Sequence, residues 1–153
     1  MQPFIAYQNA ARAFDEAFDQ SIDAPGSIRP TEVERLRGEA YSKMQAFLAW
    51  VPETAEDAAV KLEDAAASIE SGTFVSVGDL SVCDLSATAT ELAALVIGGE
   101  QTPALASRLR RLIADCEESI VAHHRMHLRS DGADVIELLR TTLTGLTRLR
   151  VVE

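Results

Sequence analysis

Aromatic residues, cysteines and long apolar segments are all scarce in this sequence of 153 residues. Aromatic side chains make up 5% of it, so a core must be built mainly from Leu, Ile, Val and Ala. The two cysteines, Cys83 and Cys116, stand far apart and outside any C-x-x-C spacing, which argues against a disulfide framework or a zinc knuckle. No window approaches 18 consecutive apolar residues and the N-terminus lacks a basic segment. We therefore expect a cytoplasmic protein that neither spans a membrane nor is exported.

Positive charge is also scarce, because the formal net charge is −10. Residues 1–103 hold 17 acidic and 6 basic residues, whereas residues 104–153 hold 7 and 8. An acidic chain repels nucleic acid, and the bases of the last third are interspersed with acids, so no nucleic-acid partner is expected. Arg108, Arg110 and Arg111 are expected to form ion pairs along their own helix rather than to hold a phosphate.

Helix start and stop signals, by contrast, are frequent. Apolar residues at helical spacing predict a first helix over about residues 3–20, and residues 23–27 then break it. Thr31 and Glu34 have the spacing of a capping box, in which each side chain satisfies an amide of the first turn. This spacing predicts a second helix that Pro52 ends.

The middle of the chain contains a third helix and one segment without helical period. Thr54 is the predicted N-cap of this helix and Gly72 its predicted C-cap. Residues 73–83 are biased toward β-branched residues around a Gly-Asp pair, and two alternatives remain for them, a short hairpin or an extended loop. Asp84 or Ser86 is expected to cap the next helix.

Three further helices follow to the end of the chain. The fourth contains the run 92–97, which is apolar on nearly all sides. The fifth begins with Pro103 and ends near Arg129, and a short turn at 130–132 implies that the last helix packs antiparallel to it. The sequence therefore predicts an all-α helical bundle of about five to six helices, in a single domain over residues 1–153.

One stretch resembles a known group of proteins. The segment WVPET at 50–54, followed by AAVKL at 58–62, is similar to a Pro-x-Thr helix start with a downstream Lys-Leu in small uncharacterised helical proteins of GC-rich bacteria. The resemblance covers about thirteen residues, and its motif is helix capping plus amphipathic spacing. It implies an all-helical bacterial protein and no particular activity.

The only concentration of potential metal ligands lies in the predicted fifth helix. His123 and His127 share a helix face, and Cys116 lies one heptad before His123, so the three form a candidate site for a transition metal. The alternative is that these residues end a hydrophobic stripe and bond to neighbouring helices. A second alternative makes His124 or His127 the phosphate acceptor of a phosphotransfer module, although the residues that usually follow such a histidine are missing.

Protein association is the function that the sequence favours. The eight glycines form neither a G-x-G-x-x-G nor a P-loop spacing, and G-x-S-x-G and calcium-loop motifs are missing, so no cofactor is expected and the chain is treated as non-enzymatic. An apolar fourth helix needs cover on most sides, and the last helix stays apolar to its end. We therefore expect a homodimer that buries part of residues 86–97 or the final helix pair.

Overall fold

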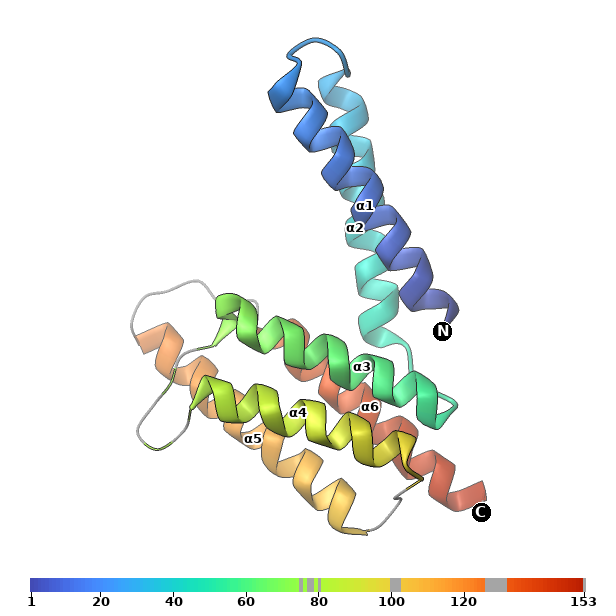
Figure 1. The fold of residues 1–153 in the computed structure, drawn as a ribbon, viewed down its shortest axis with the longest axis vertical. Coiled ribbons are helices and arrows are strands. Elements are labelled where there is room, and N and C mark those ends of the chain that lie inside the picture. Colours follow the sequence, from blue (N-terminus) through green and yellow to red (C-terminus); the bar gives the residue numbers. More distant parts are fainter. Residues whose placement is uncertain (75, 77–78, 80, 100–102, 126–131, 153) are drawn as a thin grey trace. The chain divides into compact units, whose positions relative to one another are not determined.

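The regular secondary structure in the described part of this chain is helical (Figure 1). A computed structural model describes residues 1–74, 76, 79, 81–99, 103–125 and 132–152. These residues contain six α-helices and one π-helical turn, and none of them lies in a strand. The predicted all-α class with five to six helices is therefore confirmed.

The described chain forms two compact units, Met1–Trp50 and Val51–Glu153. The single domain over residues 1–153 stays a prediction, and each unit is described by itself below. None of the described helices has both the length and the apolar character that crossing a membrane requires.

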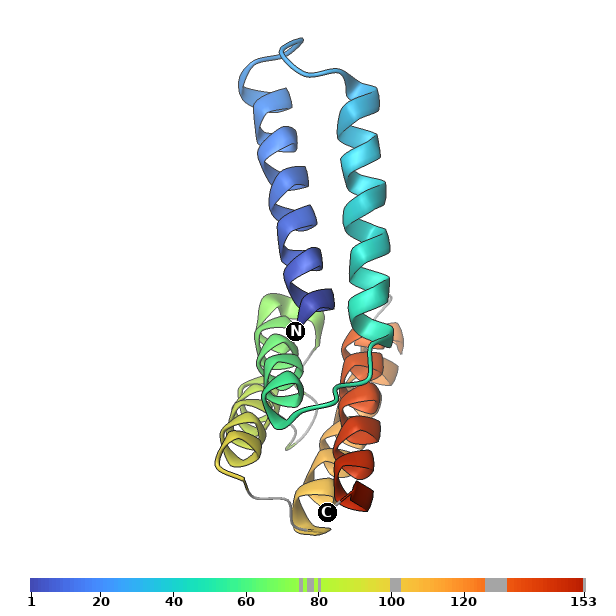
Figure 2. The same cartoon turned by 90° about the vertical axis from the view of Figure 1, so that its right-hand side faces the viewer.

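The first unit is a helical hairpin of α1 (Gln2–Asp23) and α2 (Pro30–Ala49), which run antiparallel and pack against each other (Figure 2). α1 extends beyond its predicted end near residue 20, and the amide of its C-cap Ala24 still donates to the carbonyl of Gln20. The connection contains Gly26, whose φ of 88° is a left-handed conformation that glycine adopts without steric cost.

The capping box predicted at Thr31 and Glu34 is wrong. α2 begins at Pro30, two residues before the start that a cap at Thr31 implies, and its N-cap Arg29 makes no side-chain capping bond. Proline favours the first helical position because it has no amide to satisfy and its φ is already helical. Thr31 is consequently an ordinary residue of the first turn. The helix does stop before Pro52, as predicted.

The second unit opens with a capped helix, α3 (Ala55–Ser68). The Thr54 hydroxyl accepts a hydrogen bond of 3.1 Å from the backbone amide of Asp57, which confirms Thr54 as the N-cap. Glu56 and Asp57 follow in the first turn, where the positive end of the helix dipole stabilises a carboxylate.

The end of α3 differs from the prediction. The helix continues into a π-helical turn, η1 (Ile69–Thr73), and Gly72 lies inside this turn, so its prediction as a C-cap is wrong. Phe74 follows the turn and is buried. In the predicted hairpin or loop at 73–83, the described residues include no strand, and residues 75, 77, 78 and 80 lie outside the described part of the chain.

Helices α3 to α6 form a four-helix bundle in which α3 and α5 each pack against both α4 and α6 (Figure 1). The other three helices are α4 (Val82–Ile97), α5 (Pro103–Arg125) and α6 (Gly132–Val152). α6 runs antiparallel to α5, as predicted. The core of the bundle consists mainly of aliphatic and alanine side chains, among them Leu62, Ala65, Leu92, Ala93, Leu109, Leu112 and Leu139.

α4 begins earlier than predicted, with Ser81 as its N-cap residue and without a side-chain capping bond. Asp84 and Ser86 lie inside the helix and cap nothing. Ser86 is buried, and its hydroxyl lies 3.1 Å from the carbonyl oxygen of Ala66 and 2.8 Å from Glu70 Oε1. A serine that local sequence identifies as a cap is thus a polar contact between α4 and the end of α3.

The segment that precedes α3 packs closely on α6 at Gly145. A Cβ at Gly145 would lie 2.6 Å from the carbonyl oxygen of Pro52 and 2.7 Å from its Cγ, both shorter than van der Waals contact. Glycine inside a helix is less favourable than alanine by about 0.5–1 kcal/mol. The close approach of Pro52, which is itself buried, explains why a glycine occupies this position.

Candidate functional site

Aromatic side chains are concentrated in the helical hairpin, which holds seven of the eight in the chain. Phe47 of α2 is the centre of one group. Its ring centroid lies 5.2 Å from that of Phe4, 5.7 Å from that of Tyr7 and 6.3 Å from that of Trp50. These separations are typical of favourable ring pairs, so this group holds the start of α1 against the end of α2.

A second ring group lies nearer the connection between the helices. The centroids of Phe14 and Phe18 are 5.9 Å apart, and the guanidinium of Arg37 lies 5.5 Å from the centre of the Phe14 ring. This distance allows a cation–π contact between α1 and α2. We call the residues of the two groups the aromatic seam: Phe4, Tyr7, Phe14, Phe18, Phe47 and Trp50.

The sequence of α1 explains the seam. Residues 4, 7, 11, 14 and 18 alternate in spacings of three and four, which places them along one stripe of the helix, as in a coiled coil. Ala10 and Ala17 lie beside this stripe and are buried. Small buried residues let α2 approach closely, while the rings along the stripe are too large for a single partner helix to cover.

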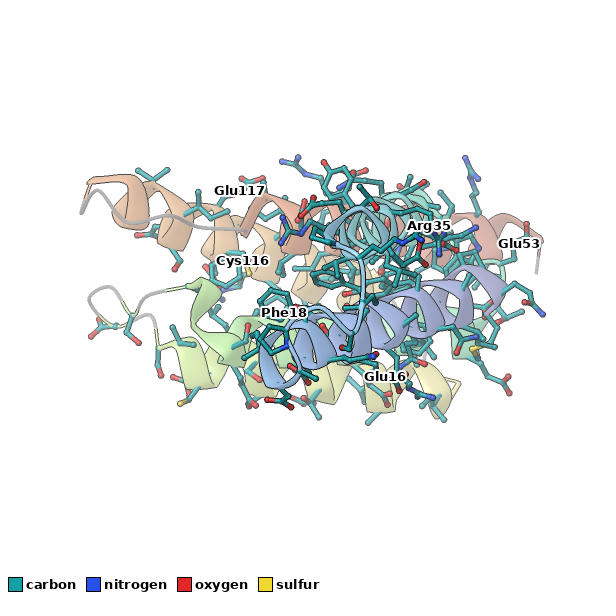
Figure 3. All side chains as sticks on the ribbon, turned by 90° about the horizontal axis from the view of Figure 1, so that it is seen from above. Glu16, Phe18, Arg35, Glu53, Cys116 and Glu117 are labelled. Carbon is teal, nitrogen blue, oxygen red and sulfur yellow. The ribbon has the colours of Figure 1, made fainter. Side chains whose placement is uncertain are left out.

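Much of this apolar surface stays exposed. Of the seven large hydrophobic residues exposed in the described chain, five lie in the hairpin, although it has only about a third of the residues. Phe18 is 41% exposed, Ile22 59% and Tyr41 61%. Figure 3 shows Phe18 and the charged Glu16 on opposite sides of α1. The hairpin therefore presents an amphipathic surface on which apolar side chains face solvent.

A pocket of about 330 Å³ lies at the end of the hairpin that carries the connection. Glu34 and Arg37 form an ion pair of 3.2 Å at the pocket, and both are largely exposed. Most of the other lining residues are apolar, which makes this end a hydrophobic recess with one ion pair. The lining residues are Phe18, Ser21, Pro25, Gly26, Ile28, Pro30, Val33, Glu34 and Arg37.

The candidate metal site has little support among the described residues. Cys116 is fully buried in α5 and points into the bundle, whereas Glu117 points away from it (Figure 3). Burial raises the pKa of the Cys116 thiol to about 12, and Asp115 and Glu117 add to this effect. No group of three His, Cys, Asp or Glu residues in the described part of the chain could hold a metal ion.

The histidines of both alternatives are only partly described. His123 and His124 belong to the last turn of α5, and their side chains lie outside the described structure. All of His127 lies outside it as well. The metal site at Cys116, His123 and His127 and the phosphate acceptor at His124 or His127 therefore stay predictions.

Sequence reasoning missed a buried lysine, Lys61 on α3. Its side chain has no exposed surface, and its Nζ donates a hydrogen bond to the hydroxyl of Thr141 on α6. Desolvation lowers the pKa of Lys61 to about 8, against the opposing effect of Glu137 and Asp64. Lys61 lies three residues after Ala58 and four before Ala65, so the three share one face of α3. Because Ala58 and Ala65 are predicted to face the core, this spacing is the sequence signal that Lys61 faces inward. Because the amine is closed off from solvent, Lys61 links two helices and is not placed to meet a substrate.

The ion pairs of the bundle also differ from the prediction. Arg108 does not pair along its own helix but with Glu91 of α4, at 2.8 Å. Glu117 pairs with Arg140 of α6. Both pairs are largely exposed and join neighbouring helices, so each stabilises the bundle by at most about 1 kcal/mol.

Comparison of the chain with models of protein families, with characterised proteins and with solved structures found no match. The function of the chain is therefore inferred from its own residues. Among the described features, the exposed apolar surface of the hairpin is the one whose physical chemistry points to a partner.

Proposed function

We propose that this protein is a non-enzymatic helical protein that acts through protein association, and that it forms a homodimer through the helical hairpin. The observation that carries the proposal is the exposed apolar surface of α1 and α2, in particular Phe18, Ile22 and Tyr41. Soluble chains rarely leave several large apolar side chains exposed together unless a partner covers them.

The size of the hairpin supports this proposal. A helix in water depends mainly on tertiary packing of its apolar face, and two helices can cover only one side of each other. Two hairpins that pack face to face form a four-helix bundle, the arrangement that the second unit already shows within one chain. A stable interface of this kind buries on the order of 1,200–2,000 Å² in total.

The proposed surface differs from the one that the sequence favoured. α4 places Leu85, Ala89, Leu92 and Val96 in the core of its own bundle, which accounts for most of its apolar character. Ile97 at the end of α4 is 61% exposed, but it is an isolated residue, unlike the several exposed apolar side chains of the hairpin. Single exposed apolar residues are normal on proteins. The hairpin is therefore the better candidate.

The test compares two variants with matched exposure. In Ile22→Glu the charge enters the hairpin surface, and in Ile97→Glu it enters the end of α4, at 59% and 61% exposure. Light scattering coupled to size exclusion should give the parent chain at twice its mass of 16.5 kDa. We expect Ile22→Glu to shift toward monomer and Ile97→Glu to stay dimeric.

The opposite pattern would assign the interface to residues 86–97. A parent chain that stays at 16.5 kDa at all micromolar concentrations would contradict the homodimer. Val121→Glu, at an exposed apolar position of α5, tests the final helix pair, and loss of the dimer in this variant would assign the interface there.

A further inference from the structure

Charge is distributed unevenly along the hairpin. We divide the hairpin into a base half, residues 1–12 and 40–50, and a tip half, residues 13–39. The charged side chains of the base half are Arg12 and Lys43, which give it a side-chain charge of +2. The tip half has a side-chain charge of −4, because it contains three basic residues and seven acidic ones: Arg29, Arg35 and Arg37 against Asp15, Glu16, Asp19, Asp23, Glu32, Glu34 and Glu39.

Ion pairs within α2 leave the acidic excess on α1. Arg35 pairs with Glu32 at 2.7 Å and with Glu39 at 3.0 Å, and Arg37 pairs with Glu34 at 3.2 Å. The hydrogen bond from Arg35 holds the pKa of Glu32 below its usual value. The remaining acidic residues of the tip half, all exposed, lie on the second half of α1: Asp15, Glu16, Asp19 and Asp23.

Exposed apolar side chains occur in both halves. Met1, Ile5 and Tyr41 lie in the base half, and Phe18 and Ile22 lie in the tip half. The two ring groups of the aromatic seam are divided in the same way between the halves. Apolar contact alone therefore allows a second hairpin to pack in either direction, and charge decides between the two.

We infer that two copies of this chain pair through antiparallel hairpins, so that the tip half of each lies against the base half of the other. The inference rests on the homodimer proposed above. In a parallel pair, two halves of charge −4 would lie side by side, and like charges repel where they approach within a Debye length of about 8–10 Å. In the antiparallel pair each half of charge −4 lies beside one of charge +2.

Symmetry makes this arrangement self-consistent. A twofold axis perpendicular to the hairpin repeats the tip-to-base contact twice, as an isologous interface requires. Complementary charge at an interface raises the rate of encounter and rejects wrong orientations, whereas the apolar contacts supply most of the affinity. The second copy thus covers the exposed apolar surface of the hairpin, and its charges determine the direction in which the two hairpins pack.

The first arm of the test measures distances between spin labels in the full chain. Exposed Cys83 is replaced by Ser, buried Cys116 is kept, and one label is introduced by Ser27→Cys at the tip or by Gln2→Cys at the base. α1 has 22 residues and is therefore about 33 Å long. The antiparallel pair predicts tip-to-tip distances of roughly this length and a short tip-to-base distance, of roughly 20 Å or less, in a mixture of the two variants.

The second arm reverses the charge of the base half with Arg12→Glu and Lys43→Glu together. The matched control, Arg110→Glu and Arg111→Glu on α5, changes the net charge of the chain equally and alters exposed residues. We expect the dissociation constant at low salt to rise at least about tenfold for the base variant and little for the control. A parallel dimer would show no such rise, because base halves of equal charge face each other before and after the change.

The outcomes separate the two proposals. A dimer with short tip-to-tip distances, or one that tolerates the base reversal as well as the control does, overturns the antiparallel arrangement and leaves the homodimer standing. A chain that light scattering finds at 16.5 kDa overturns both. A dimer with short tip-to-base distances and a sensitive base half supports both.

Discussion

The helices of the two units bury their apolar faces with different kinds of side chain. In the four-helix unit, each helix has two neighbours, and leucine and alanine are enough to close the core around residues such as Leu92 and Leu139. Within the hairpin, each helix has one other helix to pack against, and nearly all the aromatic residues of the chain are used there. Apart from Phe47, which is buried, those rings increase the area of contact and yet stay partly exposed.

The difference shows how the number of neighbouring helices determines what a sequence must supply. A side chain such as Ala65 or Ala93 is fully or almost fully buried when helices surround it. On a two-helix unit even a phenylalanine, Phe18, is 41% exposed. The four-helix unit is therefore expected to be stable by itself, whereas the hairpin gains most from a partner.

The largest expected effect tests the closed core. Leu139→Ala removes a fully buried side chain from α6 and should lower the free energy of unfolding by about 2–5 kcal/mol. Leu36→Ala in the hairpin truncates a half-buried side chain of the same size and should lower it by about half as much or less. Urea denaturation of both variants measures the difference. Equal losses would contradict the contrast between the units.

A buried charge also distinguishes the four-helix unit, and its effect depends on pH. The pKa of Lys61 is about 8 in the folded chain, whereas the ordinary value of 10.5 applies to the unfolded chain. Between these two pH values the amine is therefore protonated in the unfolded chain and mostly neutral in the folded one. The free energy of unfolding should therefore rise as the pH rises from about 8 to 10.5, by on the order of 3 kcal/mol.

Lys61→Met is the control for this pH dependence. Methionine keeps the apolar stem and removes the amine, so the rise should disappear while every other titrating group is retained. Replacing a buried charge with an apolar side chain is often neutral or stabilising, and we expect no loss of stability at pH 7. An identical rise in the variant, measured by urea denaturation across this pH range, would assign the effect to other groups.

Two glycines give the smallest of the three effects, with opposite signs. Gly145→Ala should lower the free energy of unfolding by about 1–3 kcal/mol, because the new Cβ would collide with Pro52. Gly38→Ala, in α2, meets nothing within 4 Å and should raise it by about 0.5–1 kcal/mol through helix propensity. Scanning calorimetry compares the two midpoints. A stabilising Gly145→Ala would show that Pro52 moves freely.

Features that depend on neighbours in the sequence were predictable. The Thr54 cap, the stop before Pro52 and the first helix follow from residues within one or two turns, and the structure confirms each of them. The capping box at Thr31 failed for an equally local reason, because Pro30 starts the helix two residues before the start that this cap implies.

Features that depend on distant residues were not predictable. Lys61 meets Thr141 across 80 positions, and Gly145 meets a proline from before α3. The spacing of Lys61 within α3 indicates that it faces inward, but neither partner can be identified from the helix that holds the residue. Ser86 has the residue type and place of a cap but becomes a buried contact because α3 lies beside it. The candidate site contains one feature of each kind. The stripe that contains Phe18 was visible in the sequence, whereas its exposure depends on how many helices surround it.

The uneven placement of aromatic residues gives this protein two separate optical signals. Its one tryptophan, Trp50, and both tyrosines, Tyr7 and Tyr41, belong to the hairpin. Intrinsic fluorescence therefore reports on the hairpin. The far-ultraviolet dichroism of the backbone is weighted toward the second unit, because its four α-helices together contain more residues than the two of the hairpin. Whether the two units melt together or one after the other can thus be observed in the unlabelled chain, by following both signals through a single thermal scan.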